Sequence, residues 1–228
     1  MYKIKYMKAK MKVEIKWSPN FAYALGLLAT DGSLSIDNRH IDFTSKDIEQ
    51  IKNFMQCLKI EVAVGYKKSG TSSSITARIQ FSDVNFYRFL ESIGFMPRKS
   101  KIIREIKIPD IYFRDFLRGH FDGDGSFYPY YDKRWKSSFI FYTSFTSASK
   151  IHIMWIQKKI NALVGIHGYI DAPPSISVIQ LKYAKRESLK LLPYMYYNEK
   201  VVCLSRKRNK IKAAMRKCAG GEMGNTLP

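Results

Sequence analysis

Two related stretches are the most informative part of the 228-residue sequence: ALGLLATDGSL at residues 24–34 and LRGHFDGDGSF at residues 117–127. Each contains a glycine, four intervening residues, the tripeptide Asp-Gly-Ser and an apolar residue. Asp124 follows Asp31 by 93 residues (124 − 31). Because the whole pattern recurs with the same internal spacing, it indicates an internal repeat.

Further similar segments follow the two stretches in the same order. They are DFTSKDIEQIKNF (42–54) and SFTSASKIHIMWI (144–156), ARIQF (77–81) and SVIQL (177–181), and MPRKSKI (96–102) and LSRKRNKI (204–211). The shared order predicts two halves of about a hundred residues each. We expect an N-terminal half at residues 1–107, a C-terminal half at residues 108–215 and a frayed tail at residues 216–228.

Each half is expected to contain a helix, strands, a helix, strands and a final helix. Ser18 and Pro19 supply an N-cap and a first-turn proline for the first helix, and Asp110 is the expected cap of its counterpart. Residues 75–81 alternate between apolar and polar side chains, which predicts a half-buried strand with a polar outer face. Further strands are expected at 40–45 and 139–145, and further helices at 48–58 and 83–93.

The charge of the chain is strongly one-sided. It has 39 Lys and Arg residues against 19 Asp and Glu residues, a formal net charge of +20. This excess favours a polyanionic partner, either nucleic acid or an anionic membrane surface. No segment approaches the roughly 18–20 consecutive apolar residues that cross a bilayer. The basic start has no apolar signal core and the three cysteines have no metal or disulfide spacing, so we expect an intracellular protein, in cytoplasm, nucleoid or organelle, that is not secreted.

Two glycines, Gly26 and Gly119, fall inside the expected helices of the repeat. Glycine costs roughly 1 kcal/mol relative to alanine in a helix interior, a cost that close approach of two backbones can offset. We therefore expect the two helices to pack together at these positions and to bring Asp31 and Asp124 side by side. Adjacent carboxylates need a nearby cation, and oxygen ligands favour Mg²⁺ over zinc.

The two stretches resemble the paired LAGLIDADG motifs of the monomeric homing endonucleases. ALGLLATDG (24–32) and LRGHFDGDG (117–125) each match at the glycine, at apolar positions and at the closing Asp-Gly. Ala29 replaces an acidic residue that Asp122 retains in the second copy, and Thr30 replaces the usual small residue. Neither departure affects the carboxylate that this family uses to bind metal.

The resemblance implies an α+β fold of two pseudo-symmetric αββαββα halves, each with a curved antiparallel sheet, joined through the paired motif helices. It implies that Asp31 and Asp124 are catalytic carboxylates that hold two or three Mg²⁺ ions, with Mn²⁺ able to substitute. The family also has a basic residue near each site, which would stabilise charge or polarise water. The best matches are Lys99 and Lys207, with Arg98 and Arg206 as alternatives, and phosphate contact is the alternative role.

The resemblance further implies that each sheet lies along the major groove of double-stranded DNA. The expected contacts are Arg39, Lys67, Arg78 and Gln80 in the first half and Arg134, Lys136, Gln180 and Lys182 in the second. Arg and Gln can read purine edges, whereas Lys mainly neutralises phosphates; the alternative is a solvated sheet face. Aromatic residues within 127–135 could stack on bases or pack at the sheet edge. Ser45 and Ser147 fall where the family often has a polar residue that orders water.

The resulting hypothesis is a monomeric, intron-encoded endonuclease that cuts both strands of a long asymmetric DNA site and leaves short 3′ overhangs. The alternative is a non-cleaving nucleic-acid binder of the same fold, such as a maturase that binds intron RNA or a regulator. A structural RNA-binding protein would explain the charge but not the repeated Asp-Gly. Cleavage with Mg²⁺ and binding with Ca²⁺ would separate these classes.

Overall fold

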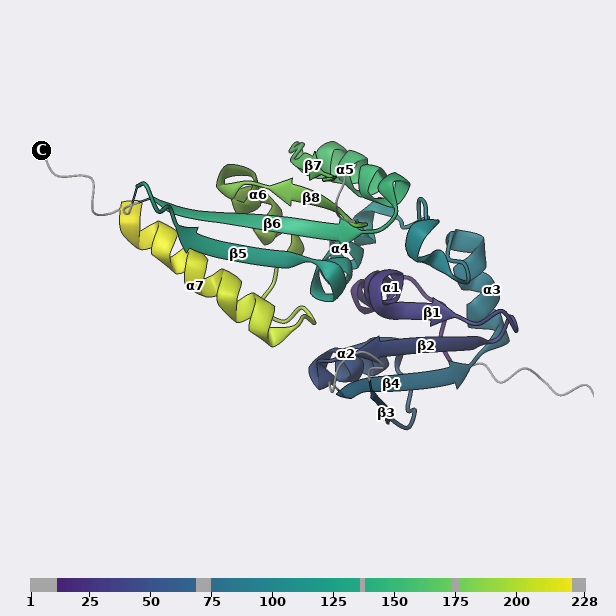
Figure 1. Ribbon diagram of the computed structural model, residues 1–228. Coiled ribbons are helices and arrows are strands. Elements are labelled where there is room, and N and C mark those ends of the chain that lie inside the picture. Colours follow the sequence, from purple (N-terminus) through teal and green to yellow (C-terminus); the bar gives the residue numbers. More distant parts are fainter. Residues whose placement is uncertain (1–11, 69–74, 136–137, 174–176, 223–228) are drawn as a thin grey trace, which may run out of the picture.

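The computed structural model describes residues 12–68, 75–135, 138–173 and 177–222, and the chain forms two halves with the same order of elements (Figure 1). The first half contains α1 (Pro19–Asp31), β1 (Gly32–Leu34), β2 (His40–Ser45), α2 (Ile48–Leu58), β3 (Gly65–Lys68), β4 (Ile75–Ser82) and α3 (Val84–Ile93). A 3₁₀ turn, η1 (Lys99–Lys101), precedes the second half. The second half contains α4 (Asp110–Asp124), β5 (Ser126–Tyr131), β6 (Phe139–Ser147), α5 (Lys150–Val164), β7 (Tyr169–Asp171), β8 (Ile179–Tyr183) and α6 (Lys185–Met195), and it is followed by α7 (Ser205–Glu222). The expected α+β fold of two αββαββα halves is confirmed.

Each half contains one four-stranded antiparallel sheet, ordered β1-β2-β4-β3 in the first half and β5-β6-β8-β7 in the second. Helices α2 and α3 pack on one face of the first sheet, and α5 and α6 pack on the corresponding face of the second. The inward residues are buried and apolar, as in the pairs Phe43–Ile79 and Phe145–Leu181. Alternate residues of the same strands point to the opposite face, so each sheet has one face in the core and one face available to a partner.

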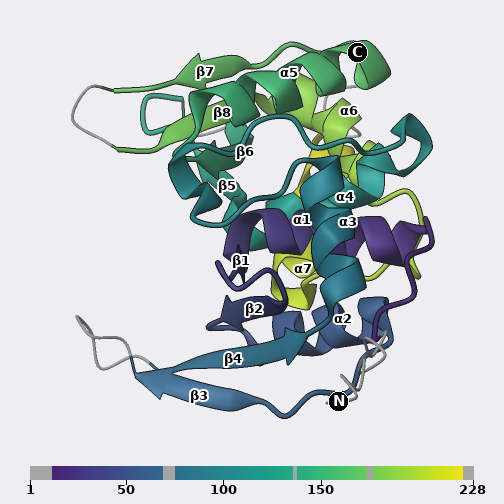
Figure 2. The ribbon, with the colours of Figure 1, turned by 90° about the vertical axis from the view of Figure 1, so that its right-hand side faces the viewer.

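The two halves meet along α1 and α4, which pack closely side by side. A methyl group added at Gly26 would lie 2.1 Å from the carbonyl oxygen of Phe116, and one added at Gly119 would lie 2.1 Å from that of Tyr23. The expected close approach of the two helices at these glycines is confirmed. In Figure 2 the β3–β4 and β7–β8 hairpins extend to the same side of the molecule, on either side of this helix pair.

Two local expectations differ from the structure. The N-cap position of α4 is Pro109, and Asp110 is the first helical residue. There its negative charge still interacts favourably with the positive end of the helix dipole. Residues 216–222, expected as part of a frayed tail, belong to α7, because Ala, Met, Lys and Arg over 212–217 are good helix formers. None of the helices in the described ranges combines the length and the apolar character that crossing a membrane requires.

Candidate functional site

The carboxylates of Asp31 and Asp124 lie at the C-terminal ends of α1 and α4, where the two halves meet. A methyl group added at Gly123 would lie 2.8 Å from Asp31 Oδ2 and 1.9 Å from Thr30 Oγ1. Asp31 therefore packs directly against the residue that precedes Asp124, and only glycine fits between them. The close approach of the helices places the two carboxylates at one site, as the repeat predicts.

The two carboxylates are electrostatically unfavourable as a pair. Burial, and then the negative charge of Asp124, raise the pKa of Asp31 from 3.8 to about 6, although Thr30 and two lysines oppose the shift. Burial also raises the pKa of Asp124, which Lys99 and Lys207 oppose. Raised values mean that the protein alone does not fully compensate the negative charge. A cation between or beside the carboxylates would supply the missing compensation.

Lys99 and Lys207 occupy equivalent places at the ends of the two motif helices. The Lys99 ammonium group donates hydrogen bonds to the carbonyl oxygens of Thr30, at 3.2 Å, and Gly32, at 2.5 Å. The Lys207 ammonium group donates to the carbonyl oxygens of Asp122, at 2.9 Å, and Gly125, at 2.6 Å. Each lysine thus caps a helix C-terminus, where a positive charge is favourable.

Both lysines are buried, and burial lowers the pKa of each from 10.5 to about 8. The charges of Asp31 and Asp124 act in the opposite direction and favour the protonated ammonium. The competing arginines lie elsewhere: Arg98 is exposed, and Arg206 is exposed and forms an ion pair with Asp47, with Nε 2.7 Å from Oδ2. The geometry therefore brings the two lysines to the carboxylates and leaves the two arginines outside.

Gln50 is a member of the site that the sequence reasoning missed. Its amide nitrogen lies 3.2 Å from Asp31 Oδ2, and its amide oxygen accepts a hydrogen bond of 2.7 Å from the Ser45 hydroxyl. Ser45 thus orients Gln50 and touches Asp31 only through it. Positions 50, 54 and 58 form one helical stripe, so a polar residue beside Phe54 and Leu58 was the available signal.

The second half has a histidine in place of this glutamine, since the repeat aligns Gln50 with His152. The His152 ring stacks on His120 with centroids 5.3 Å apart, and its Nδ1 lies 2.7 Å from the carbonyl oxygen of Arg104. Burial lowers the pKa of both rings, so they are neutral near pH 7. No group of three or more His, Cys, Asp or Glu side chains suited to a metal occurs among the described residues.

Asp122, the extra acid of the second motif, is fully buried below the site. It accepts hydrogen bonds from the Tyr23 hydroxyl at 2.8 Å and from the Leu204 amide at 2.7 Å. It therefore joins α4 to α1 and to the segment that leads into α7. Because Lys207 lies three residues beyond Leu204, this contact helps to hold Lys207 in place.

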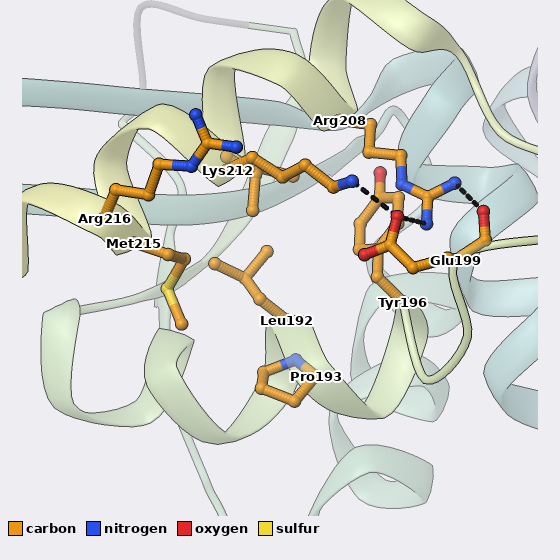
Figure 3. Close-up of a pocket in the computed structure, with 9 residues that line it drawn as sticks. Leu192, Pro193, Tyr196, Glu199, Arg208, Lys212, Met215 and Arg216 are labelled. Carbon is orange, nitrogen blue, oxygen red and sulfur yellow. Dashed lines mark hydrogen bonds and ion pairs between the residues drawn. The ribbon is translucent and has the colours of Figure 1, made fainter. Parts of the chain in front are cut away.

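A pocket of about 380 Å³ lies between α6 and α7 (Figure 3), and neither of the paired aspartates is among the residues that line it. Leu192 and Met215 line its apolar part. Glu199, at its rim, accepts hydrogen bonds from Arg208, at 3.1 Å, and from Lys212, at 2.5 Å. The charges at the rim are thus paired. These contacts link the segment before α7 to α7 itself, the helix that carries Lys207.

The residues expected to contact DNA lie on the outer faces of the sheets or on neighbouring loops. Arg39 and Arg134 lie on the loops after β1 and β5, and each is close to an aspartate of its own loop. Lys67 is exposed on β3. Arg78 and Gln80 share the outer face of β4, and Gln180 and Lys182 share that of β8. Lys136 falls outside the described residues.

The second sheet carries a set of outward tyrosines that the sequence pattern identified only in part. Strand pairing places Tyr128 opposite Tyr142 and Tyr169 opposite Lys182 on this face. Tyr130 stacks on Tyr142 with centroids 6.4 Å apart. Of the aromatic residues considered from sequence, Phe127 belongs to the core, whereas Tyr128 and Trp135 are exposed. The outer face of the first sheet is thus polar, whereas that of the second combines tyrosines with polar residues such as Gln180 and Lys182.

No protein-family model and no curated protein matches this chain in sequence. Solved structures do match it in fold. Meganuclease I-SmaMI bound to uncleaveable DNA has a TM-score of 0.59 at 14% identity, over 86% of this chain and 90% of that chain. I-GzeII in complex with its DNA target has a TM-score of 0.59 at 11% identity, over 93% and 94% of the two chains. Full-length DUF199/WhiA from Thermatoga maritima has a TM-score of 0.53 at 16% identity, over 91% and 71%.

Proposed function

We propose that this chain, which has the fold of the single-chain LAGLIDADG homing endonucleases, is a site-specific DNA endonuclease that cuts both strands of its target. One observation carries the proposal: Asp31 and Asp124 lie together where the two halves meet, with a buried lysine beside each helix end. A pure binding protein has no need of two apposed carboxylates facing a polyanion. Their retention therefore supports hydrolysis rather than binding alone.

Double-stranded DNA is the partner that the two sheets and the charge support. The major groove is about 12 Å wide and admits a β-ribbon. The net charge of +20 favours a phosphate backbone. Because the outer face of the second sheet carries several tyrosines that have no counterpart on the first, the two halves would read different sequences. We therefore propose a long asymmetric target bound by a monomer with internal pseudo-twofold symmetry.

Asp31 and Asp124 are suited to divalent metal. Mg²⁺ is usually held by one or two carboxylates, with waters and phosphate oxygens completing its shell. Two hard oxygen donors fit that requirement, since burial raises the pKa of both carboxyl groups and the charge of Asp124 raises that of Asp31 further. When bound, Mg²⁺ or Mn²⁺ would activate water and neutralise charge on the scissile phosphates. The protein's own contribution is to orient the two DNA strands at the carboxylates. Gln50 and Lys99 hold the end of α1 around Asp31, and Lys207 holds the end of α4 around Asp124.

Burial and, after it, the charge of Asp124 oppose ionisation of Asp31, which predicts a stabilising effect of Asp31→Asn in metal-free protein. The folded-state pKa of Asp31, about 6, lies above the ordinary 3.8, so its contribution to stability is full below pH 3.8 and is lost as pH rises through 6. At 1.36 kcal/mol per pKa unit the cost at pH 7 is on the order of 3 kcal/mol. At pH 7 the variant should melt roughly 6 °C higher than the wild type. At pH 4 the two proteins should melt at nearly the same temperature.

Thermal melts at the two pH values with chelator present measure this difference. Added Mg²⁺ should raise the melting temperature of the wild type at pH 7 and leave Asp31→Asn nearly unchanged. Equal melting temperatures of the two proteins at pH 7 without metal would show that ionised Asp31 does not destabilise the folded protein.

Replacing Lys99 or Lys207 with methionine should move the acid limb of the cleavage pH profile to higher pH. Both ammonium groups lower the pKa of Asp31 and of Asp124, so removing either makes the carboxylates harder to ionise. Activity at pH 7 should fall roughly 10- to 100-fold, as for other groups that support metal ligands. Initial cleavage rates between pH 5.5 and 9 measure the shift. Lys101→Met, an exposed position on the same 3₁₀ turn, is the matched control and should leave the profile in place.

A binding protein without nuclease activity, such as an intron RNA maturase or a regulator, is the second candidate, because the positive charge suits it equally well. One experiment separates the two. Two kinds of duplex are used: the joined flanks of the gene that encodes the protein, and a randomised library. Each is incubated with Mg²⁺ to score cleavage and with Ca²⁺ to score binding. Recovery of a discrete cut site supports the endonuclease. Sequence-selective binding in Ca²⁺ with no cut in Mg²⁺ or Mn²⁺ would reject it in favour of the binder.

A further inference from the structure

A three-residue network occupies the outer face of the first sheet, where the proposed function places DNA. It consists of Asp42 on β2 and Arg78 and Gln80 on β4. Arg78 donates to Asp42 Oδ1 through both Nε, at 2.7 Å, and Nη2. Gln80 donates to Asp42 Oδ2 through Nε2, at 3.2 Å. The Asp42 side chain is 14% exposed and that of Arg78 is 41% exposed, so the acid lies beneath the groups that it orients.

The network determines which hydrogen-bonding groups remain for a partner. An ionised carboxylate only accepts hydrogen bonds, so the amide of Gln80 must turn its nitrogen towards Asp42. Its Oε1 and one N–H remain unused by this network. Arg78 gives Asp42 one side of the guanidinium group, which leaves the end-on pair of N–H groups on Nη1 and Nη2. Asp42 thus fixes two planar groups at once.

The remaining groups match two purines in the major groove. Two parallel N–H donors on arginine fit O6 and N7 of guanine, and the oxygen and N–H of glutamine fit N6 and N7 of adenine. Residues two apart on a strand are about 6.8 Å apart along it. Bases on one strand are separated by about 3.4 Å along the helix axis. Arg78 and Gln80 therefore reach bases about two steps apart when β4 follows the groove.

An acid on a DNA-facing surface would by itself repel phosphate. Its presence beneath Arg78 and Gln80 is explained if its role is orientation and not affinity. The second sheet offers a contrast, because Asp171 there pairs with Lys182, whose ammonium has no planar fork. The two-purine arrangement thus belongs to the first sheet.

We infer that Asp42 is a specificity-determining positioning residue, which aims Arg78 at a guanine and Gln80 at an adenine in the half-site read by the first sheet. The inference rests on the proposed function, since it requires that this face bind duplex DNA. It leads to one distinctive prediction: replacing Asp42 must relax base selectivity at two positions of the DNA target together, the guanine read by Arg78 and the adenine read by Gln80. Total affinity should be unchanged or greater, because one negative charge is removed from the interface.

Binding selection on a randomised duplex library in Ca²⁺ tests the inference without requiring cleavage. The wild type should enrich a guanine and, about two steps away, an adenine in one half-site, each by at least about fivefold over other bases. Asp42→Ala should lose both preferences. Arg78→Lys, which keeps the charge but has no fork, should lose the guanine preference alone. Asp171→Asn, on the other sheet, is the matched control and should keep both.

A melting temperature for each variant, together with retained affinity for bulk DNA, verifies that each is folded. Selective binding by the wild type, with the same two preferences in Asp42→Ala, would overturn the inference and leave the proposed function intact. Loss of one preference only in Asp42→Ala would also overturn it, because a shared orienting acid must affect both. Failure of the wild type to bind duplex DNA would instead reject the proposed function.

Discussion

Replacing Asp124 with asparagine should abolish double-strand cleavage, with a loss of at least about 10³-fold, the upper range for removing one electrostatic contact at a reacting group. The amide keeps the shape of the side chain but cannot supply the negative charge that holds a divalent ion. Asp31→Asn should do the same, because a double-strand break requires both carboxylates. The measurement is conversion of a supercoiled plasmid carrying the selected target to linear product, in Mg²⁺ at pH 8.

DNA binding should survive the same substitution. Removing a negative charge beside the phosphates leaves affinity in Ca²⁺ equal or higher. Asp110→Asn is the matched control, since it removes a carboxylate from the exposed first turn of the same helix. Its ion pair with Lys159 is partly exposed and contributes little, so activity should stay within about twofold. Wild-type cleavage by Asp124→Asn would refute the proposed role of this residue.

A single methyl group at the helix interface should have the largest effect on stability. In Gly26→Ala the new Cβ would lie 2.1 Å from the Phe116 carbonyl oxygen and 2.7 Å from the His120 nitrogen, and both are backbone atoms that cannot rotate away. The helices must separate, although alanine itself favours a helix by about 1 kcal/mol. We expect a net loss of about 3 kcal/mol or more in the free energy of unfolding, the upper range for overpacking.

Gly119→Ala should behave alike, because its Cβ would lie 2.1 Å from the Tyr23 carbonyl oxygen. Thermal or urea unfolding measures both variants. Gly65→Ala is the control: its Cβ would meet the Arg78 carbonyl oxygen at 3.7 Å, an ordinary contact, so its stability should change by less than about 1 kcal/mol. A Gly26→Ala protein as stable as Gly65→Ala would mean that the helices pack less closely than described.

The sequence predicted the paired helices and the two carboxylates because the physical cause is local. Glycine in a helix interior is unfavourable unless another backbone approaches it, so Gly26 and Gly119 indicated the contact directly. The shared spacing then placed Asp31 and Asp124 at one end of the pair. Lys99 and Lys207 could be placed near the helix ends through the resemblance. Their choice over Arg98 and Arg206 required the structure, since it depends on which side chain is buried.

The remaining site residues depend on contacts between distant segments. Alternation along β4 predicts that Arg78 and Gln80 share a face, but only the strand register brings Asp42 to both of them. Tyr142 likewise joins the outer face of the second sheet through its pairing with Tyr128. The ion pair between Arg206 and Asp47 joins residues 159 positions apart, for which no periodic pattern gives a signal. Periodicity and composition do not predict which distant residues pair with one another.

Strand-resolved mapping of the ends that the wild type produces on its selected target, in Mg²⁺, is the most direct measurement. We expect one cut on each strand, between the half-sites bound by the two sheets, with short 3′ overhangs and with both cuts absent in Asp124→Asn. Cuts confined to one strand, ends scattered along the DNA, or tight binding without any cut would contradict a two-carboxylate endonuclease.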